Sequence, residues 1–223
     1  MYTFVLGPLV WLSFTVFILG TGFQVFRFFK LSRKAAPATH VPLSNLIKNT
    51  RKRSFHESIS GLFEKAGRTV LGVDPAVIIV STVFHVFLLI IPLFLLGHNI
   101  LIESALGVSL PSMRESTTDF LTGAYLLCCV FFLLRRIFVA RVRALTSPYD
   151  YFVLALAIVP FASGFLAFHQ IFDYDTVILI HMLSGEFLLM AIPFTKLTHM
   201  IFFFMNRFMI INEHTIGRGS RVW

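Results

Sequence analysis

Five long apolar stretches constrain the fold of this chain more than any other feature of its sequence. A bilayer core about 30 Å thick is crossed by a helix of roughly 20 apolar residues. With 57% hydrophobic residues and 27 phenylalanines, the chain carries more apolar surface than one soluble core needs, and lipid is the natural place for it. We therefore expect an all-α membrane protein, a bundle of five transmembrane helices over residues 4–26, 77–102, 120–134, 151–168 and 176–205.

The basic residues gather in the connections of one side of this bundle. Of the 19 Lys and Arg residues, ten lie between Arg27 and Ala76, four between Arg135 and Arg143, and three after Met205. Because cytoplasmic loops carry the excess of Lys and Arg, we expect a periplasmic N-terminus and a cytoplasmic C-terminus. The net charge of +8 then reflects membrane topology, so we expect contact with membrane lipid and none with nucleic acid.

The chain divides into four parts along its length. Residues 1–30 form the first transmembrane helix, which lacks the charged start and small-residue cleavage site of a signal peptide. Residues 31–76 form a basic cytoplasmic loop, in which residues 54–71 have the pattern of an amphipathic helix. That helix either lies on the membrane surface or docks a cytoplasmic partner. Residues 77–208 form a four-helix core, and residues 209–223 a cytoplasmic tail.

Four histidines lie inside the apolar stretches of this core, where ionisable side chains are costly and usually functional. His85 and His98 lie on the second predicted helix, His181 and His199 on the fifth. The 18 residues between His181 and His199 correspond to five helical turns, so both would project from one face about 27 Å apart. Because the two helices run in opposite directions, His85 matches His199 in depth, and His98 matches His181.

Two imidazoles from different helices are the axial ligands that a b-type haem requires. Zinc sites need three or four ligands at one point, whereas these histidines form two separate pairs. We expect two haems b, or one if His98 does not bind. His98 lies about 140° around the helix from His85, and Pro92 between them can bend or unwind the helix. The alternatives are histidines that only hydrogen-bond to neighbouring helices, in a haem-free anchor or a transporter.

Three cationic side chains lie at the cytoplasmic level of the predicted haems. Lys196, Arg135 and Arg136 either pair with haem propionates or extend to lipid headgroups. These three residues are therefore candidate cofactor-binding residues together with the four histidines.

A second group of polar residues suggests a quinone or proton site. Glu186, deep in the fifth helix, must be paired or protonated. His169, with Asp173 and Asp175, lies at the periplasmic end of the fourth helix, where it either takes protons from a quinol or belongs to a polar interfacial loop. No set of side chains has the pattern of a catalytic triad, so we expect no covalent catalysis.

Two motifs resemble the gamma subunit of respiratory nitrate reductase, a five-helix di-haem cytochrome b. The fifth helix has His181 followed by Pro-Phe-Thr-Lys-Leu-Thr-His at residues 193–199, similar to that family's Pro-Phe-Ser/Thr-Arg/Lys-Leu-x-His. The turn over residues 135–146, with Asp150 following, is similar to its cytoplasmic signature. The resemblance spans residues 77–208 and implies ligands at His181, His199 and His85. Its second ligand on the second helix falls at Leu95, three residues before His98.

The basic loop resembles instead the cytochrome b subunits of sulfate reducers' transmembrane redox complexes, such as the tetrahaem-cytochrome-associated complex. That resemblance implies the bacterial inner membrane and a cysteine-rich iron–sulfur partner in the cytoplasm, similar to heterodisulfide reductase. A periplasmic multihaem cytochrome c is a further candidate partner. We expect an electron-transfer subunit of an oxidoreductase complex that connects cytochrome c or quinol outside with the iron–sulfur protein inside. The alternative is an anchor subunit with its own quinone site near the periplasmic haem, for which menaquinone is the candidate cofactor.

Overall fold

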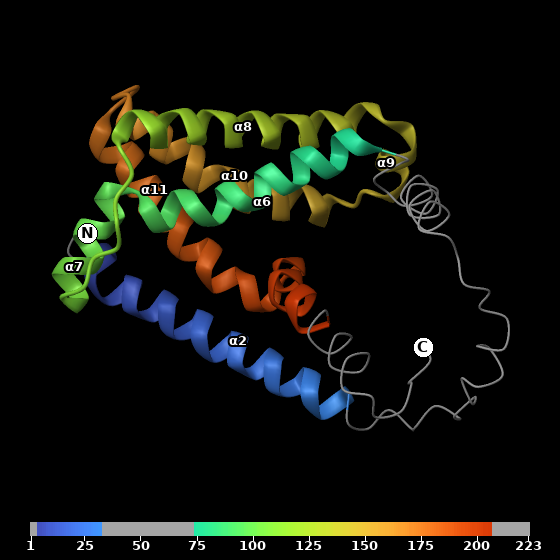
Figure 1. Cartoon of the computed structure of the whole chain (residues 1–223), viewed down its shortest axis with the longest axis horizontal. Helices are drawn as coiled ribbons and strands as arrows, with labels where there is room; N and C mark the ends of the chain where they lie inside the picture. The colour runs from blue at the N-terminus through green and yellow to red at the C-terminus, as the bar shows by residue number, and fades with distance from the viewer. Residues whose placement is uncertain (1–3, 33–73, 207–223) are drawn as a thin grey trace, which may run out of the picture. The chain divides into compact units, whose positions relative to one another are not determined.

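The computed structural model describes residues 4–32 and 74–206, which are helical with short connections (Figure 1). Five of its helical segments are long and apolar enough to cross a membrane, as the sequence predicts. These segments are Val5–Leu31, Pro75–Phe94, Glu115–Phe138, Pro148–Phe168 and Tyr174–Phe194. The prediction of five membrane-spanning helices is therefore confirmed.

The helices follow one another in chain order with a few irregular turns between them. A π-helical turn at Val5–Leu9, which contains Pro8, leads into the first long helix. The elements after it are α2 (Val10–Ser32), α6 (Pro75–Phe94), α7 (Leu96–Leu106), α8 (Glu115–Phe138), α9 (Ala140–Leu145), α10 (Pro148–Phe168), α11 (Tyr174–Ala191), η2 (Ile192–Phe194) and η3 (Lys196–Thr198). The predicted amphipathic helix at residues 54–71 and the tail at residues 209–223 lie outside the described residues.

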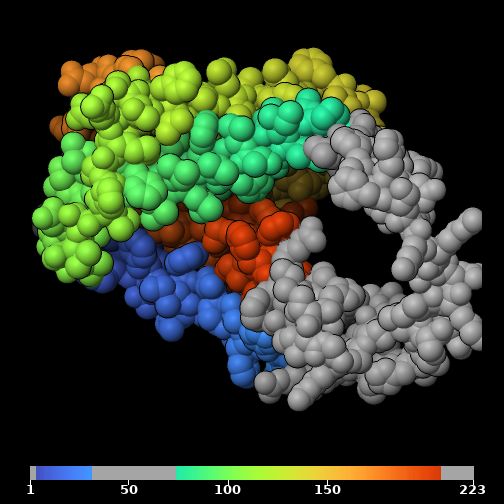
Figure 2. All heavy atoms as spheres, viewed as in Figure 1, coloured from blue at the N-terminus to red at the C-terminus, as the bar shows by residue number. Residues whose placement is uncertain are grey.

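The described chain forms two compact units. The larger unit holds residues 74–185, and the smaller unit holds residues 4–32 and 186–206, so the boundary falls within α11. In the smaller unit α2 packs against η2. Many apolar side chains of α2 are exposed, among them Trp11, Ile18 and Phe23, and Figure 2 draws this helix in blue. Such a surface is typical of a helix that faces lipid.

The core of the larger unit forms around Tyr125 of α8, which is fully buried. α8 packs against both α6 and α10. The Tyr125 ring contacts Phe84 of α6 and Phe161 of α10, with ring centroids 5.0 Å and 4.1 Å apart. Its hydroxyl donates a hydrogen bond of 3.0 Å to the Ala157 carbonyl, so the buried polar atom is satisfied.

The second predicted helix is not continuous. α6 ends at Phe94, Leu95 is extended with φ −69° and ψ 128°, and α7 begins at Leu96. Pro92 lies in the last turn of α6, where its ring and missing N–H weaken the helix. The backbone N–H of Met113 donates to the Phe94 carbonyl (2.9 Å), which stabilises the break. His98 therefore lies on α7, and its predicted position on the same helix as His85 is wrong.

The fifth predicted helix is also interrupted. α11 gives way to the 3₁₀ turns η2 and η3, with Thr195 extended between them at φ −118° and ψ −178°. Pro193 has no N–H to continue the α-helical ladder, and the Thr195 hydroxyl accepts a hydrogen bond from the Leu197 N–H (3.3 Å). The predicted five-turn register of His181 and His199 on one continuous helix is therefore wrong.

We predict that Gly20→Ala destabilises the protein and that Gly22→Ala, two residues further along α2, does not. A Cβ at Gly20 would lie 2.7 Å from Cγ of Pro193, whereas a Cβ at Gly22 would meet nothing within 4 Å. Overpacking of this kind costs roughly 1–3 kcal/mol. Thermal unfolding in detergent measures the difference, and equal melting temperatures for the two variants would contradict the packing of α2 on η2.

Candidate functional site

Two of the four histidines that the sequence singles out lie side by side in the larger unit. The ring centroids of His98, on α7, and His181, on α11, are 5.9 Å apart, and the ring planes differ by 19°. The break at Leu95 sets the direction of α7 independently of α6. The two rings therefore meet, although on one continuous helix His98 would point away from the face that carries His85.

Each imidazole of this pair donates a hydrogen bond through Nδ1 to a backbone carbonyl. His98 Nδ1 lies 2.9 Å from the Pro92 carbonyl oxygen, and His181 Nδ1 lies 2.7 Å from that of Pro160. Because a carbonyl only accepts hydrogen bonds, Nδ1 carries the hydrogen in both rings. Nε2 then has the lone pair. Histidines that bind metals are commonly oriented in the same way, by a hydrogen bond from the ring nitrogen that does not bind the metal.

The surroundings of the two rings explain these hydrogen bonds. The Pro92 carbonyl belongs to the last turn of α6, where carbonyls have no partner within the helix. The His181 ring lies directly against Gly164 of α10, since a Cβ there would come 2.9 Å from Cε1 of the imidazole. Gly164 therefore makes room for the ring beside the Pro160 carbonyl.

His85 and His199 follow the same pattern. His85 Nδ1 donates to the Ser81 carbonyl (2.6 Å), and His199 Nδ1 donates to the Lys196 carbonyl (2.7 Å). All four histidines thus have Nδ1 bonded to main chain. His85 belongs to the larger unit and His199 to the smaller, so their pairing stays a prediction.

The separation of the His98 and His181 rings is one that two imidazoles bound to a single iron would have. Metal–imidazole bonds of about 2.0 Å place the centres of two imidazoles on opposite sides of one ion roughly 6 Å apart. The observed 5.9 Å agrees with this separation. Among the described residues, no group of three or more His, Cys, Asp and Glu side chains is arranged to hold a metal ion. The candidate metal-binding atoms of this pair are the two imidazole Nε2 atoms.

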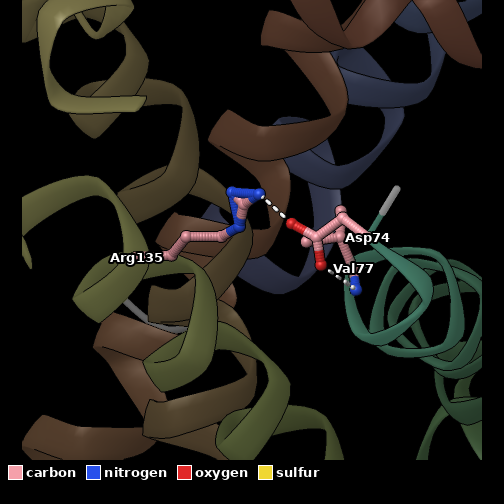
Figure 3. Close-up of polar contacts among 3 residues, drawn as sticks. All are labelled: Asp74, Val77 and Arg135. Atoms are coloured by element: carbon pink, nitrogen blue, oxygen red, sulfur yellow. Dashed lines mark hydrogen bonds and ion pairs between the residues drawn. The ribbon is translucent and has the colours of Figure 1, made fainter. Parts of the chain in front are cut away.

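Arg135 and Arg136, at the end of α8, have different surroundings. Arg135 forms an ion pair with Asp74, which precedes α6 and accepts a hydrogen bond from the Val77 N–H (Figure 3). The Arg135 guanidinium, for which the sequence left a haem propionate or lipid headgroups as alternatives, thus joins α8 to the start of α6. Nη1 of Arg136 is buried and has no hydrogen-bond partner in the described part of the chain, so it can still receive an anionic group.

Two further candidate residues belong to the smaller unit. Lys196 begins η3, and its carbonyl holds the His199 ring. Glu186 is only 6% exposed, and neither of its carboxylate oxygens has a hydrogen-bond partner among the described residues. A lone carboxylate at this depth is costly, so we expect Glu186 to be protonated.

The predicted quinone or proton residues separate into two roles. His169, at the end of α10, bonds through Nε2 to Asp119 Oδ1 of α8 at 2.8 Å. Asp173 accepts hydrogen bonds from the hydroxyl and the N–H of Thr176 (2.7 Å and 2.9 Å), as the N-cap of α11. These bonds lower the pKa of Asp173, so its carboxylate is a poor proton acceptor near neutral pH.

Sequence reasoning missed several residues that shape the site. Asp119 stands 50 residues from His169 in the sequence, and Gly164 carries no chemistry of its own. Asn99, next to His98, is 2% exposed and donates to the Ser112 hydroxyl (2.9 Å), while its Oδ1 has no partner among the described residues. An amide in an apolar segment beside a candidate ligand was the available signal for Asn99.

The fold and site define a multi-pass membrane protein with two neighbouring histidine rings, those of His98 and His181. A protein of the bacterium Nitratidesulfovibrio vulgaris strain Hildenborough is 35% identical over 226 residues, which cover 99% of this chain and 96% of that protein. The chain belongs to the same family as this protein. No family model matches the chain, and no solved structure matches it.

We predict that Asp74→Ala destabilises the protein more than Asp74→Asn does. Alanine removes both the N-cap of α6 and the ion pair with Arg135, and loss of a cap costs about 0.5–2 kcal/mol. Asparagine keeps a capping oxygen and loses only a partly exposed ion pair, worth about 0–1 kcal/mol. Denaturant unfolding in detergent gives the order, and an equal loss in both variants would contradict the cap.

Proposed function

We propose that the chain is a haem b membrane subunit that carries electrons across a bacterial inner membrane. The observation that supports this function best is the His98–His181 pair, with ring centroids 5.9 Å apart and both Nδ1 atoms bonded to carbonyls. A haem bound there would supply a one-electron carrier. The protein holds the two imidazoles in the tautomer that leaves Nε2 for iron.

A second haem, held by His85 and His199, belongs to the same proposal. Their Nδ1 hydrogen bonds match those of the first pair, and the sequence resemblance assigns both as ligands. The buried Nη1 of Arg136 and the ammonium of Lys196 are the cations proposed for the propionates. Arg135 supports this region through Asp74.

The proposed partners follow from the predicted topology and from the resemblance. The basic loop, the α8–α10 connection and the tail would face the cytoplasm, with the N-terminus in the periplasm. This positively charged face would dock an iron–sulfur subunit with cysteine-rich modules. A periplasmic multihaem cytochrome c, or a quinol, would exchange electrons with the His98–His181 haem.

We predict two haems b per purified chain, measured by the pyridine haemochrome assay and by reduced-minus-oxidised spectra. His181→Ala removes one haem because it removes an axial ligand. Gly164→Ala lowers the haem content as well, since its Cβ would displace the His181 ring, whereas Gly123→Ala adds a methyl group with nothing within 4 Å. Absence of haem b bands from the wild-type protein would refute the proposed function.

A second candidate function is quinol oxidation by this subunit, with menaquinol as substrate. The pair His169–Asp119 favours this function. His169 lies five residues beyond Gly164 at the end of α10, a helical rise of about 7.5 Å, and Gly164 lies against the His181 ring. We predict that a menaquinol analogue reduces the haems and that a quinone-site inhibitor blocks this reduction. Reduction only by cytochrome c would favour a simple electron conduit instead.

A further inference from the structure

His169 differs from the other four histidines of the described chain in the nitrogen that it uses. His169 bonds through Nε2 to the carboxylate of Asp119, at 2.8 Å, whereas His85, His98, His181 and His199 bond through Nδ1. Because an ionised carboxylate only accepts, Nε2 carries the hydrogen, and in the neutral ring Nδ1 has the lone pair. A histidine oriented by a carboxylate in this way can act as a general base.

The backbone and two aromatic rings fix the position of this imidazole. His169 ends α10 in a Schellman motif, with Ile171 N–H bonded to Leu166 O (3.0 Å) and Gln170 N–H to Ala167 O (3.1 Å). Gln170 adopts φ 53° to close the turn. The His169 ring lies 4.4 Å from the Phe165 ring and 5.2 Å from the Phe168 ring, centroid to centroid. About a third of the His169 and Asp119 side chains is exposed, at 36% and 32%, so the base is accessible.

The same helix joins this base to the candidate haem site. Pro160 and Gly164 of α10 hold the His181 ring, and His169 lies one and a half turns beyond Gly164. A donor bound beside His169 would therefore lie near the centre that receives its electrons. A cytochrome donor loses no protons and needs no base, whereas a hydroquinone releases both electrons and protons.

We propose that His169 is the proton acceptor for a membrane-borne hydroquinone and that Asp119 positions it. This inference rests on the proposed function, since a haem held by His98 and His181 would supply the one-electron acceptor. Oxidation of one hydroquinone to quinone releases two electrons and two protons. An O–H bond of the substrate breaks, and its proton goes to Nδ1 of His169. The two electrons would leave singly to that acceptor, and the second proton follows after His169 has released the first to water.

Other ionisable groups lie near this end of the larger unit. Glu115 and Arg114 flank the start of α8, Asp173 and Asp175 the start of α11, and His181 lies deeper on α11. The hydrogen bonds from Thr176 fix Asp173 as a helix cap and lower its pKa, so its carboxylate takes up a proton less readily. Among these groups, His169 is the one whose side chain is both partly exposed and hydrogen-bonded to a carboxylate.

The test compares haem reduction by a soluble menaquinol analogue in wild type, His169→Gln and Asp119→Asn, from acid to alkaline pH. In wild type the rate falls as the pH is lowered, because a protonated imidazole accepts no proton. His169→Gln lowers the rate by about 100-fold or more, since general base catalysis contributes 10²–10⁴-fold, and abolishes this pH dependence. Asp119→Asn also lowers the rate, and Asp119→Glu restores part of it.

Three controls separate the outcomes. Glu115→Gln removes one carboxylate from the same end of α8 and should leave the rate unchanged. Dithionite reduces the haems without a base, so its rate and the haem content should be equal in all variants. ¹⁵N NMR of histidine-labelled protein should show His169 protonated at Nε2 in wild type, a readout independent of turnover. A wild-type quinol rate retained in His169→Gln, or wild-type haems that quinol does not reduce, would overturn the inference, whereas a haem-free wild type would refute the proposed function itself.

Discussion

The hydrogen bond from imidazole Nδ1 to a main-chain carbonyl is the interaction on which the site depends. It occurs at His85, His98, His181 and His199, and it fixes both the tautomer and the orientation of each ring. The Ser81, Pro92 and Pro160 carbonyls lie in segments that are apolar enough to span a membrane, where no water would compete for them. Main-chain contacts alone thus fix the orientation of these rings.

Prolines recur at the places where this interaction is made. Pro92 lies beside the break that separates α6 from α7, and its carbonyl receives the His98 bond. Pro160 offers its carbonyl to His181 from within α10, and Pro193 lies in η2, the first of the two irregular turns before His199. At the end of α6 the break leaves the Pro92 carbonyl without a helical partner, and His98 satisfies it.

The five spanning helices could be predicted because hydropathy over some 20 residues depends on composition alone. The sequence also matched His98 with His181, and the structure brings their rings together. The breaks at Leu95 and Thr195 could not be located, because proline weakens a helix without determining which neighbour becomes extended. The pairing of His169 with Asp119 joins residues 50 apart in sequence, and the role of Gly164 arises only where His181 packs on it. Such contacts depend on how helices pack, which a single sequence does not specify.

Electron paramagnetic resonance of the oxidised His85→Ala variant tests most directly whether His98 and His181 bind one iron. In this variant the other predicted haem lacks a ligand, so the remaining low-spin ferric signal reports the His98–His181 centre alone. Ring planes only 19° apart predict a rhombic low-spin signal, which His98→Ala should abolish. A high-spin spectrum alone, or a low-spin signal that survives the loss of His98, would contradict the assignment.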